Sequence, residues 1–256
     1  MLFRSNSGIV LTPGDLLRSA ARVDGGDLFR TREFRSGKIA IQDEASQLIA
    51  LLVGKGSEIL DCCAAPGGKT RLLAERNPEA KITAVELHAH RARLLRKLVP
   101  AKNVEVVHAD VRDLTQGQYD RVLVDVPCCG TGTLARNPEI KWRLKPEDLI
   151  DLHNRQLQIL HAALRRLKPG GRLVYSTCSL EREENENVLE RILADDPSIH
   201  LAEGRDELQR LRAEGFLAWT DINALTAGPY LRTIPGIHPC DGFFAAIVER
   251  DNRMQK

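Results

Sequence analysis

The chain has few aromatic residues and no long apolar run. Only 4% of its 256 residues are Phe, Trp or Tyr, although 43% are hydrophobic overall. No segment approaches the roughly 20 consecutive apolar residues that a membrane-spanning helix needs, and the N-terminus lacks the apolar core of an export signal. We therefore expect a globular protein of the cytoplasm, with no membrane partner.

The charge balance and the cysteine spacing argue against a strongly basic nucleic-acid-binding protein and against a zinc protein. A formal net charge of +2 gives no general sign of a polyanionic partner. The six cysteines form no CxxC pair, which argues against a zinc site, and we expect no metal. Without an export signal these thiols are expected to be reduced. They occur as two adjacent pairs and two single residues: Cys62-Cys63, Cys128-Cys129, Cys178 and Cys240.

From Ser57 onward, short apolar segments alternate with longer amphipathic ones. This alternation predicts an α/β fold with a parallel sheet covered by helices on both faces. Pro169-Gly170-Gly171 is predicted to end a long helix and lead into the next strand. The predicted strands are Ser57–Cys62, Lys81–Glu86, Val104–His108, Tyr119–Val126, Arg172–Ser176 and Gly242–Glu249; the predicted helices are Thr70–Arg76, Ala89–Leu98, Glu147–Leu167 and Glu183–Asp195.

The first of these strands leads into a loop of small residues, Asp61-Cys-Cys-Ala-Ala-Pro-Gly-Gly-Lys-Thr70. Such a loop lets the backbone approach a ligand closely, and the helix that follows offers free N–H groups. The loop matches neither the GxGxxG dinucleotide pattern nor the GxxxxGK[ST] phosphate loop. A nicotinamide or nucleoside-triphosphate site is therefore not indicated, and a tight structural turn is the plain alternative.

Three acids, Glu86, Asp110 and Asp125, stand at the ends of successive predicted strands. Ligands of open α/β sheets bind at this edge, where Glu86 could accept both hydroxyls of a ribose and Asp110 an adenine amino group. Any one such acid is more often a helix cap. Three of them beside a glycine loop favour an adenosine-containing ligand.

Two predicted strands also end in cysteine motifs, Asp125-Val-Pro-Cys128 and Thr177-Cys178-Ser179. Cysteine at a buried strand end is usually inert packing. A pair of thiols directed into one cleft beside a carboxylate is much less often so, and indicates covalent chemistry.

These segments closely resemble the Sun-type RNA cytosine-C5 methyltransferases. The resemblance covers roughly residues 35–250. It implies a Rossmann-like class I S-adenosylmethionine-dependent methyltransferase with a seven-stranded, mostly parallel sheet. Residues 37–256 would form the catalytic domain, and residues 1–36 a lead-in or the remnant of a small appended domain. The segments that carry the likeness are Gly37–Ser46, Asp61–Thr70, Asp125–Gly132, Arg136–Arg143, Tyr175–Leu180 and Asp241–Phe244.

The resemblance also implies roles for single residues. Cys178 matches the nucleophile that adds to carbon-6 of cytosine. The chemistry of that addition, apart from the resemblance, makes Asp125 the candidate for holding the base and Cys128 for assisting the final elimination. The positive charge of Lys69 makes it the candidate for lowering the pKa of the nucleophile. The positions that match the S-adenosylmethionine site are Cys63, Ala64, Ala65, Pro66, Gly67, Gly68, Lys69, Glu86, Asp110 and Asp125.

Three positions and the N-terminus depart from the family. Val126 and Cys129 stand where alanine and serine are commoner, and Glu86 replaces a commoner aspartate. The separate RNA-binding domain that often precedes the catalytic one is expected to be absent or truncated, which leaves the substrate less certain than the reaction.

RNA is the expected partner, with small-subunit ribosomal RNA first and transfer RNA as the alternative. The segment after the Cys128 motif mixes basic residues with a tryptophan, which could stack on a base or simply pack. The sequence carries no signal for an oligomeric state. The predicted RNA contacts are Arg136, Lys141, Trp142 and Arg143.

Two rival interpretations remain. A DNA cytosine methyltransferase would use Cys128 as nucleophile, with Glu186-Asn187-Val188 as its acidic motif. That tripeptide lies inside a predicted helix, however, and Cys178 would be unexplained. The second rival is an RNA-binding scaffold that has lost catalysis, against which the intact pair of cysteines argues.

Overall fold

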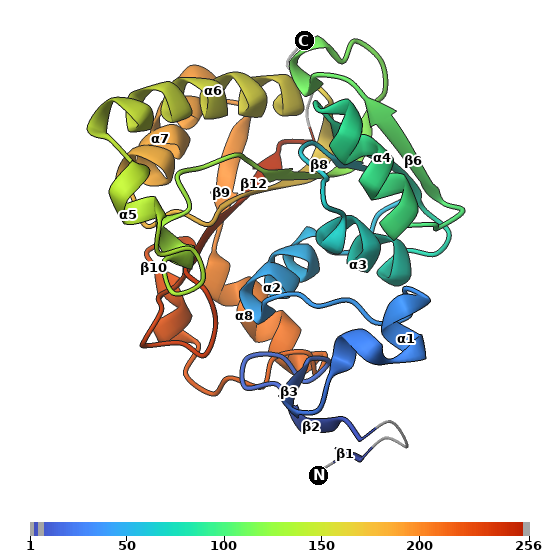
Figure 1. Cartoon of the computed structure of the whole chain (residues 1–256). Coiled ribbons are helices and arrows are strands. Elements are labelled where there is room, and N and C mark those ends of the chain that lie inside the picture. Colours follow the sequence, from blue (N-terminus) through green and yellow to red (C-terminus); the bar gives the residue numbers. More distant parts are fainter. Residues whose placement is uncertain (1–2, 5–7, 253–256) are drawn as a thin grey trace.

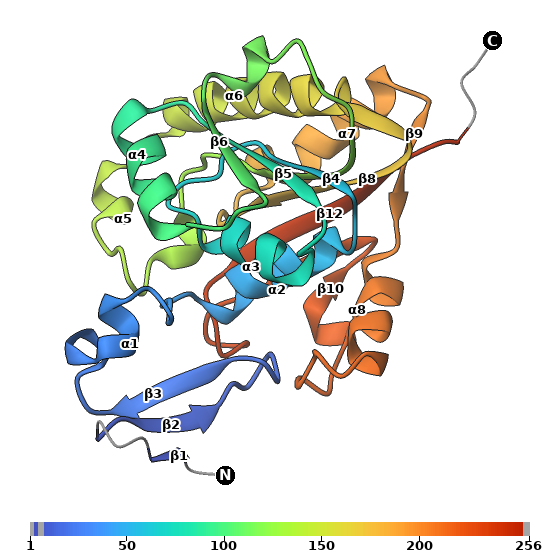
Figure 2. The ribbon, with the colours of Figure 1, turned by 90° about the vertical axis from the view of Figure 1, so that its right-hand side faces the viewer.

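The computed structural model describes residues 3–4 and 8–252 (Figure 1). Its centre is a nine-stranded sheet in the order β10-β11-β12-β8-β7-β4-β5-β6, with β9 also paired to β12. Helices lie on both faces of this sheet, as the alternating sequence pattern predicts (Figures 1 and 2).

Five adjacent strands of this sheet run parallel to one another. The bounds of β4 to β7 agree closely with the predicted strands, whereas β8 begins five residues before the predicted Arg172. The order of the strands in the sheet changes direction between β4 and β7. Ligand sites of open α/β sheets lie at this point. The five strands are β4 (Glu58–Asp61), β5 (Lys81–Glu86), β6 (Val104–His108), β7 (Tyr119–Asp125) and β8 (Leu167–Thr177).

The rest of the sheet is antiparallel and larger than expected. The predicted last strand is present as β12 (Phe243–Arg250), antiparallel to β8. On the side of β12 that faces away from β8, β9 (Ile199–Ala202) and β11 (Tyr230–Thr233) pair with different parts of the strand. β11 pairs in turn with β10 (Thr226–Ala227). The predicted count of seven strands is therefore wrong, because these short strands lack the long apolar pattern that reveals the others.

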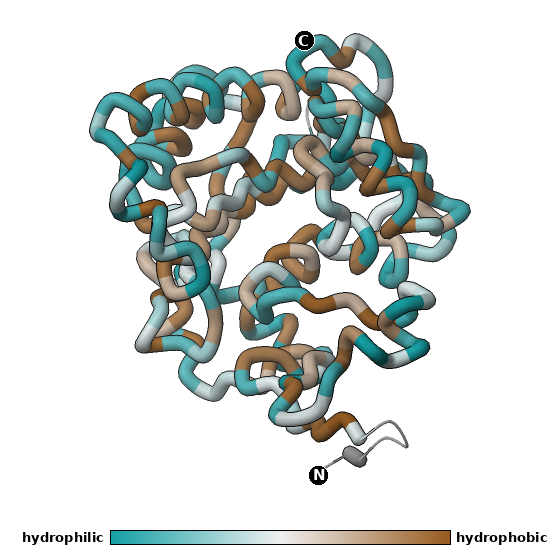
Figure 3. Tube along the Cα trace, viewed as in Figure 1, coloured by the Kyte–Doolittle hydropathy of each residue, from teal (hydrophilic) through white to brown (hydrophobic). Residues whose placement is uncertain are grey.

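Two pairs of helices cover the sheet. On one face, α2 (Glu44–Val53) and α3 (Gly68–Arg76) pack together, and α2 contacts β7, β8 and β12. On the other, α6 (Pro146–Leu164) lies against β7 and β8 beside α7 (Glu186–Asp195). Hydrophilic and hydrophobic residues alternate along α6 (Figure 3), as expected for a helix with one buried side. At the edge, α4 (Ala89–Leu98) covers β5 and β6.

The prediction for the end of α6 was wrong. The helix ends at Leu164, before Pro169-Gly170-Gly171, and this tripeptide lies within β8. Tyr119 pairs with Leu167 and Arg121 with Arg172, so β8 holds more residues than β7 over this stretch and bulges. Gly170 has a φ of +69°, which a residue with a side chain adopts only with strain.

The N-terminal region forms a separate small sheet that is tied to the main core. Between β2 and β3, Leu16 and Leu17 are completely buried and donate their N–H groups to the Glu44 carboxylate. Leu17 also bridges to Leu217. The elements of this region are β1 (Phe3–Arg4), β2 (Val10–Pro13), β3 (Ala21–Gly25), the 3-10 turn η1 (Leu28–Arg30) and α1 (Arg32–Arg35).

Among the described residues, no helix combines the length and the apolar character needed to span a membrane. In the same part of the chain, no group of three or more His, Cys, Asp or Glu side chains is arranged to hold a metal ion.

Candidate active site

The two predicted cysteines meet at the carboxyl edge of the sheet. β7 and β8 are adjacent parallel strands whose register pairs Asp125 with Ser176. Each strand leads into a loop after this pair, and the loops bring the Sγ atoms of Cys128 and Cys178 to 3.2 Å from each other. Residues separated by 50 positions in the sequence are thus brought together because their strands are neighbours.

The Cys128 loop is held closely against the Cys178 loop by backbone contacts. The Gly132 N–H donates to the carbonyl of Cys178, and the Gly242 N–H donates to the carbonyl of Gly132. A Cβ at position 132 would lie 2.1 Å from the Gly242 carbonyl oxygen, so only glycine fits here. This contact explains the Gly-Thr-Gly sequence that follows the second cysteine pair.

A buried carboxylate that the sequence did not single out supports the same loop from behind. Glu184 has no exposed surface, and its carboxylate accepts the Cys129 N–H at 3.0 Å and the Gln156 amide at 2.8 Å. Gln156 also donates to the Pro127 carbonyl. Glu184 lies in a run of charged residues that looks solvent-exposed in the sequence, so nothing local indicated its burial.

Replacing Glu184 by alanine should lower the free energy of unfolding by about 2–4 kcal/mol, because it leaves the buried Cys129 N–H without an acceptor and the Gln156 amide with one acceptor fewer. Urea denaturation would measure the loss. Glu183 is the matched control, because its side chain is exposed in the same turn. Equal stability of the two alanine variants would contradict a supporting role for Glu184.

Lys69 and Asp125 form an ion pair beside the thiols. The Lys69 Nζ donates to Asp125 Oδ2 at 2.7 Å, and the Ser176 hydroxyl donates to Asp125 Oδ1 at 2.8 Å. Both charged side chains are largely buried, with exposed fractions of 13% and 25%. The carboxylate is therefore held in one orientation by groups from α3 and β8. Ser176 belongs to a motif quoted above, but its role was not foreseen.

The surroundings of the two thiols separate their acidities. The hydrogen bond from the Cys128 thiol, reinforced by the positive charge of Lys69, lowers the pKa of Cys178 against the opposing effects of burial and of Asp125. Donation of that hydrogen bond, burial, and the charges of Glu184 and Asp125 raise the pKa of Cys128. Cys178 is consequently the more acidic thiol of the pair and Cys128 the less acidic one.

Replacing Lys69 by methionine should raise the pKa of Cys178, since a cation that favours the thiolate is lost and the opposing charge of Asp125 remains. The rate of Cys178 alkylation by iodoacetamide, followed by peptide mass spectrometry over a range of pH, reports this value without any cofactor. Lys97→Met, an exposed lysine on α4, serves as the control. An unchanged pH profile in Lys69→Met would show that Lys69 does not favour the thiolate.

The predicted cofactor loop borders a cavity of about 630 Å³. Residues 63–69 and Asp125 line one part of it, and the segment Phe34–Gln42 lines another. Gly67 at the start of α3 has a φ of +114° and provides no side-chain cap, which leaves the first-turn N–H groups of the helix available to an anionic group. The buried Glu86 accepts the His88 N–H through Oε1, and its Oε2 lies 3.9 Å from the Arg91 guanidinium. The N–H groups at the start of α3 fit the carboxylate of an amino-acid ligand, which S-adenosylmethionine has.

The remaining acid, Asp110, is occupied otherwise. Its carboxylate caps the 3-10 turn η2 (Val111–Asp113) by accepting the Arg112 N–H, and it receives the Arg112 guanidinium at 2.6 Å. The pairing with Arg112 lowers the pKa of Asp110. Neither Asp110 nor Glu86 lines the 630 Å³ cavity. The capping role considered for single strand-end acids thus describes Asp110 in this structure.

The four predicted RNA contacts fall into two groups. Arg136 is engaged in ion pairs with Asp43 at 2.6 Å and Asp241 at 3.1 Å, where it joins the segment before α2 to the segment before β12. Its guanidinium thus joins two segments of the fold, while the side chain remains 56% exposed. The other three lie on the short helix α5 (Ile140–Arg143) and are exposed.

Trp142 is not a packing residue. Its side chain is 83% exposed, and the described residues supply one close ring contact, the Lys141 ammonium at 5.0 Å. An exposed indole with an adjacent cation is suited to stacking on an unpaired base.

The acidic motif of the rival DNA enzyme is used elsewhere. Glu186 begins α7 and pairs with Arg232 of β11 at 3.1 Å, and Val188 is completely buried. The Glu186 carboxylate therefore forms an ion pair with a strand of the sheet and is not available to the cysteines.

Known proteins share both the sequence and the fold. Residues 48–249 match the family described as 16S rRNA methyltransferase RsmB/F. The probable ribosomal RNA small subunit methyltransferase B of Bacillus subtilis is 36% identical over 202 residues, 75% of this chain and 45% of that protein. The ribosomal RNA small subunit methyltransferase B of Vibrio cholerae is 33% identical over 255 residues, 96% of this chain and 54% of that protein. The chain thus spans about half the length of these curated relatives.

Among solved structures, NSun6 from Pyrococcus horikoshii, crystallised with SFG, matches with a TM-score of 0.72 at 26% identity, over 92% of this chain and 60% of that one. The predicted fold class is thereby confirmed, as is the resemblance to the Sun-type enzymes. The chain belongs to the RsmB/F family of S-adenosylmethionine-dependent ribosomal RNA methyltransferases.

Proposed function

We propose that this chain transfers a methyl group to carbon-5 of a cytosine in RNA, and that the RNA is small-subunit ribosomal RNA in the cytoplasm. The observation that carries the proposal is the approach of Cys128 and Cys178 to 3.2 Å beside the Lys69–Asp125 ion pair. Family membership supports the ribosomal substrate.

Carbon-5 of cytosine is a weak nucleophile, and the addition of a thiolate to the ring makes it a stronger one. The Cys178 thiolate forms a bond to carbon-6, which makes carbon-5 electron-rich and splits one difficult step into easier ones. Bound S-adenosylmethionine supplies the electrophilic methyl group. The target base must leave its stack to reach the thiol, as in other enzymes that react with a base.

Asp125 and Cys128 complete the proposed cycle. The Asp125 carboxylate, oriented by Lys69 and Ser176, would hold ring nitrogen 3 or the amino group of the cytosine. After methylation the carbon-5 proton leaves to a base and the bond from Cys178 to carbon-6 breaks, which restores the aromatic ring. Cys128, next to that sulfur, is the group that would assist this elimination.

A methyl-transfer assay on purified RNA tests the proposal. Unmodified 16S ribosomal RNA, bulk transfer RNA and DNA of the same sequence would be incubated with the chain and isotopically labelled S-adenosylmethionine, then digested to nucleosides. We expect labelled 5-methylcytidine from the ribosomal RNA alone. Label in another nucleoside, or in DNA, would refute the reaction; label in transfer RNA alone would refute the substrate.

We also propose that Glu86 binds the ribose of the cofactor. Its carboxylate is buried at the end of β5, where Oε1 accepts the His88 N–H. Oε2 makes only a 3.9 Å ion pair with the Arg91 guanidinium and accepts no hydrogen bond from the described residues. Glu86→Ala should weaken S-adenosylmethionine binding about 10- to 100-fold, since each charge-assisted hydrogen bond is worth about 1.5–3 kcal/mol. Glu86→Gln keeps an acceptor for the His88 N–H and tests for mere loss of structure. Calorimetry that finds unchanged affinity in both variants would assign the ribose to another residue; the exposed Glu79→Ala is the control.

A further inference from the structure

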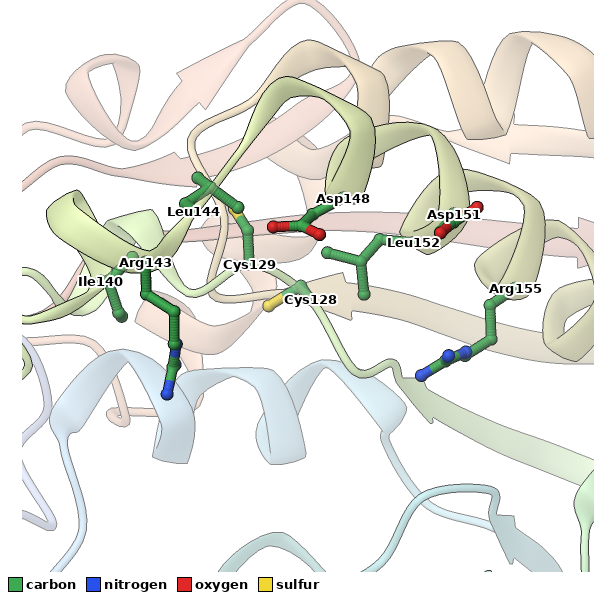
Figure 4. Close-up of a pocket in the computed structure, with 9 residues that line it drawn as sticks. All are labelled: Cys128, Cys129, Ile140, Arg143, Leu144, Asp148, Asp151, Leu152 and Arg155. Carbon is green, nitrogen blue, oxygen red and sulfur yellow. The ribbon is translucent and has the colours of Figure 1, made fainter.

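A second cavity, of about 300 Å³, opens beside Cys128 (Figure 4). Cys128 and Cys129 contribute to its wall, and the rest comes from α5, α6 and Leu144 between them. Asp125 lines the first cavity and Cys128 the second, and the two cavities have no lining residue in common. No cofactor role has been given to any residue of this second cavity.

Two arginines are the cationic residues in its lining. Arg143 comes from α5 and Arg155 from α6, and in Figure 4 their guanidinium groups lie on opposite sides of Cys128 and point to the same side of the helices. Both residues are exposed, and neither has an ion pair or a side-chain hydrogen bond to another described residue.

The lack of a partner for Arg155 is unexpected from its position. Asp151 precedes it by four residues on α6, a spacing at which an acid and an arginine usually pair on a helix surface. No such pair forms here, and Figure 4 shows the Asp151 carboxylate and the Arg155 guanidinium pointing in different directions. Arg155 is therefore extended toward the cavity, whereas most other arginines of the fold are engaged by acids or carbonyl groups.

We propose that Arg143 and Arg155 bind the RNA phosphates that flank the extruded target cytosine, one on each side of Cys128. The inference rests on the proposed function and adds Arg155 to the expected RNA contacts. A base drawn out of its stack toward Cys178 carries its neighbouring phosphates to the mouth of this cavity. Guanidinium groups bind phosphate through paired hydrogen bonds.

The acids of the cavity fix where the phosphates lie. Asp148 and Asp151 also line it, and their negative charges repel a phosphate from the part of the wall that they form. Phosphates must accordingly bind at the guanidinium ends of the two arginines. The interior of the cavity has room for part of a flanking nucleotide. The carboxylates of Asp148 and Asp151 can accept hydrogen bonds from the amino groups of its base.

The inference is tested with a short, unmodified single-stranded RNA that contains the target cytosine identified by the methyl-transfer assay. Its binding is measured over a range of salt concentrations. Arg155→Ala should weaken binding about tenfold and reduce the slope of log affinity against log salt by about 0.7, the value for one phosphate contact to a single strand. Arg155→Lys should keep most of the slope. Arg205→Ala is the control, since Arg205 is an exposed arginine on α8 (Gly204–Ala213) without a partner among the described residues.

A neutral methylphosphonate at the linkage next to the target cytosine identifies the phosphate. The modification should weaken binding to the unsubstituted protein but have little further effect on Arg155→Ala or on Arg143→Ala, depending on which linkage is replaced. If Arg155→Ala behaves like Arg205→Ala while 5-methylcytidine still forms, the inference is wrong and the proposed function stands. If no 5-methylcytidine forms while the arginine variants still bind RNA more weakly, the proposed function is wrong and the arginines remain an RNA site.

Discussion

Replacing Cys178 by alanine is expected to abolish both methylation and the covalent complex with RNA. Without the thiolate no bond to carbon-6 forms, and carbon-5 stays too electron-poor to accept a methyl group. Removing a nucleophile typically reduces turnover by a factor of about 10³ or more. The loss should appear in the chemical step, with binding of S-adenosylmethionine unchanged by calorimetry.

RNA that carries 5-fluorocytosine makes the test direct. Fluorine at carbon-5 cannot leave as a proton does, so the normal protein should remain attached to this RNA after methyl transfer, as a slow band on a denaturing gel. The band should be absent from Cys178→Ala and present in Cys240→Ala, a half-buried thiol outside the pair. A covalent band that persists in Cys178→Ala would assign the nucleophile elsewhere.

Much of this site could be predicted because it follows from strand ends. The apolar strands over 81–86, 104–108 and 119–126 are recognisable one by one, and parallel strands deliver their carboxyl ends to one edge. The motifs after β7 and β8 therefore had to meet wherever those strands were adjacent. Their adjacency was itself inferred, and the pairing of Asp125 with Ser176 confirms it.

What the sequence could not predict depends on partners that are distant along the chain. The ion pairs of Arg136 with Asp43 and Asp241 were not foreseen, because both acids lie more than 90 positions away along the chain. Glu184 and Gln156 likewise form a buried pair across 28 positions. A charged residue in a polar segment is assumed to be solvated, and only tertiary contacts overturn that assumption.

The strength of Cys128 as an acid should change during the reaction. In the free protein the hydrogen bond with Cys178, together with burial, raises the pKa of Cys128. Once the sulfur of Cys178 is bonded to carbon-6 it is no longer an anion, so that restraint on Cys128 is removed. Cys128 is then more readily ionised in the covalent complex than before it, at the stage where a proton must be taken from carbon-5.

Cys128→Ala should therefore still attack and methylate RNA, but it should stall with the RNA attached. A denaturing gel with unmodified RNA should show the slow band in Cys128→Ala, its loss on RNase digestion, and its absence from the Cys128→Ala/Cys178→Ala double variant. Cys129→Ser is the neighbouring control, because its thiol contacts Ser179 and Thr131 but not Cys178. The interpretation as a DNA-type enzyme predicts the opposite, a band that requires Cys128 and survives Cys178→Ala. The comparison separates the two because the adduct forms before it breaks down, so removing a group that serves only the second step cannot prevent the first.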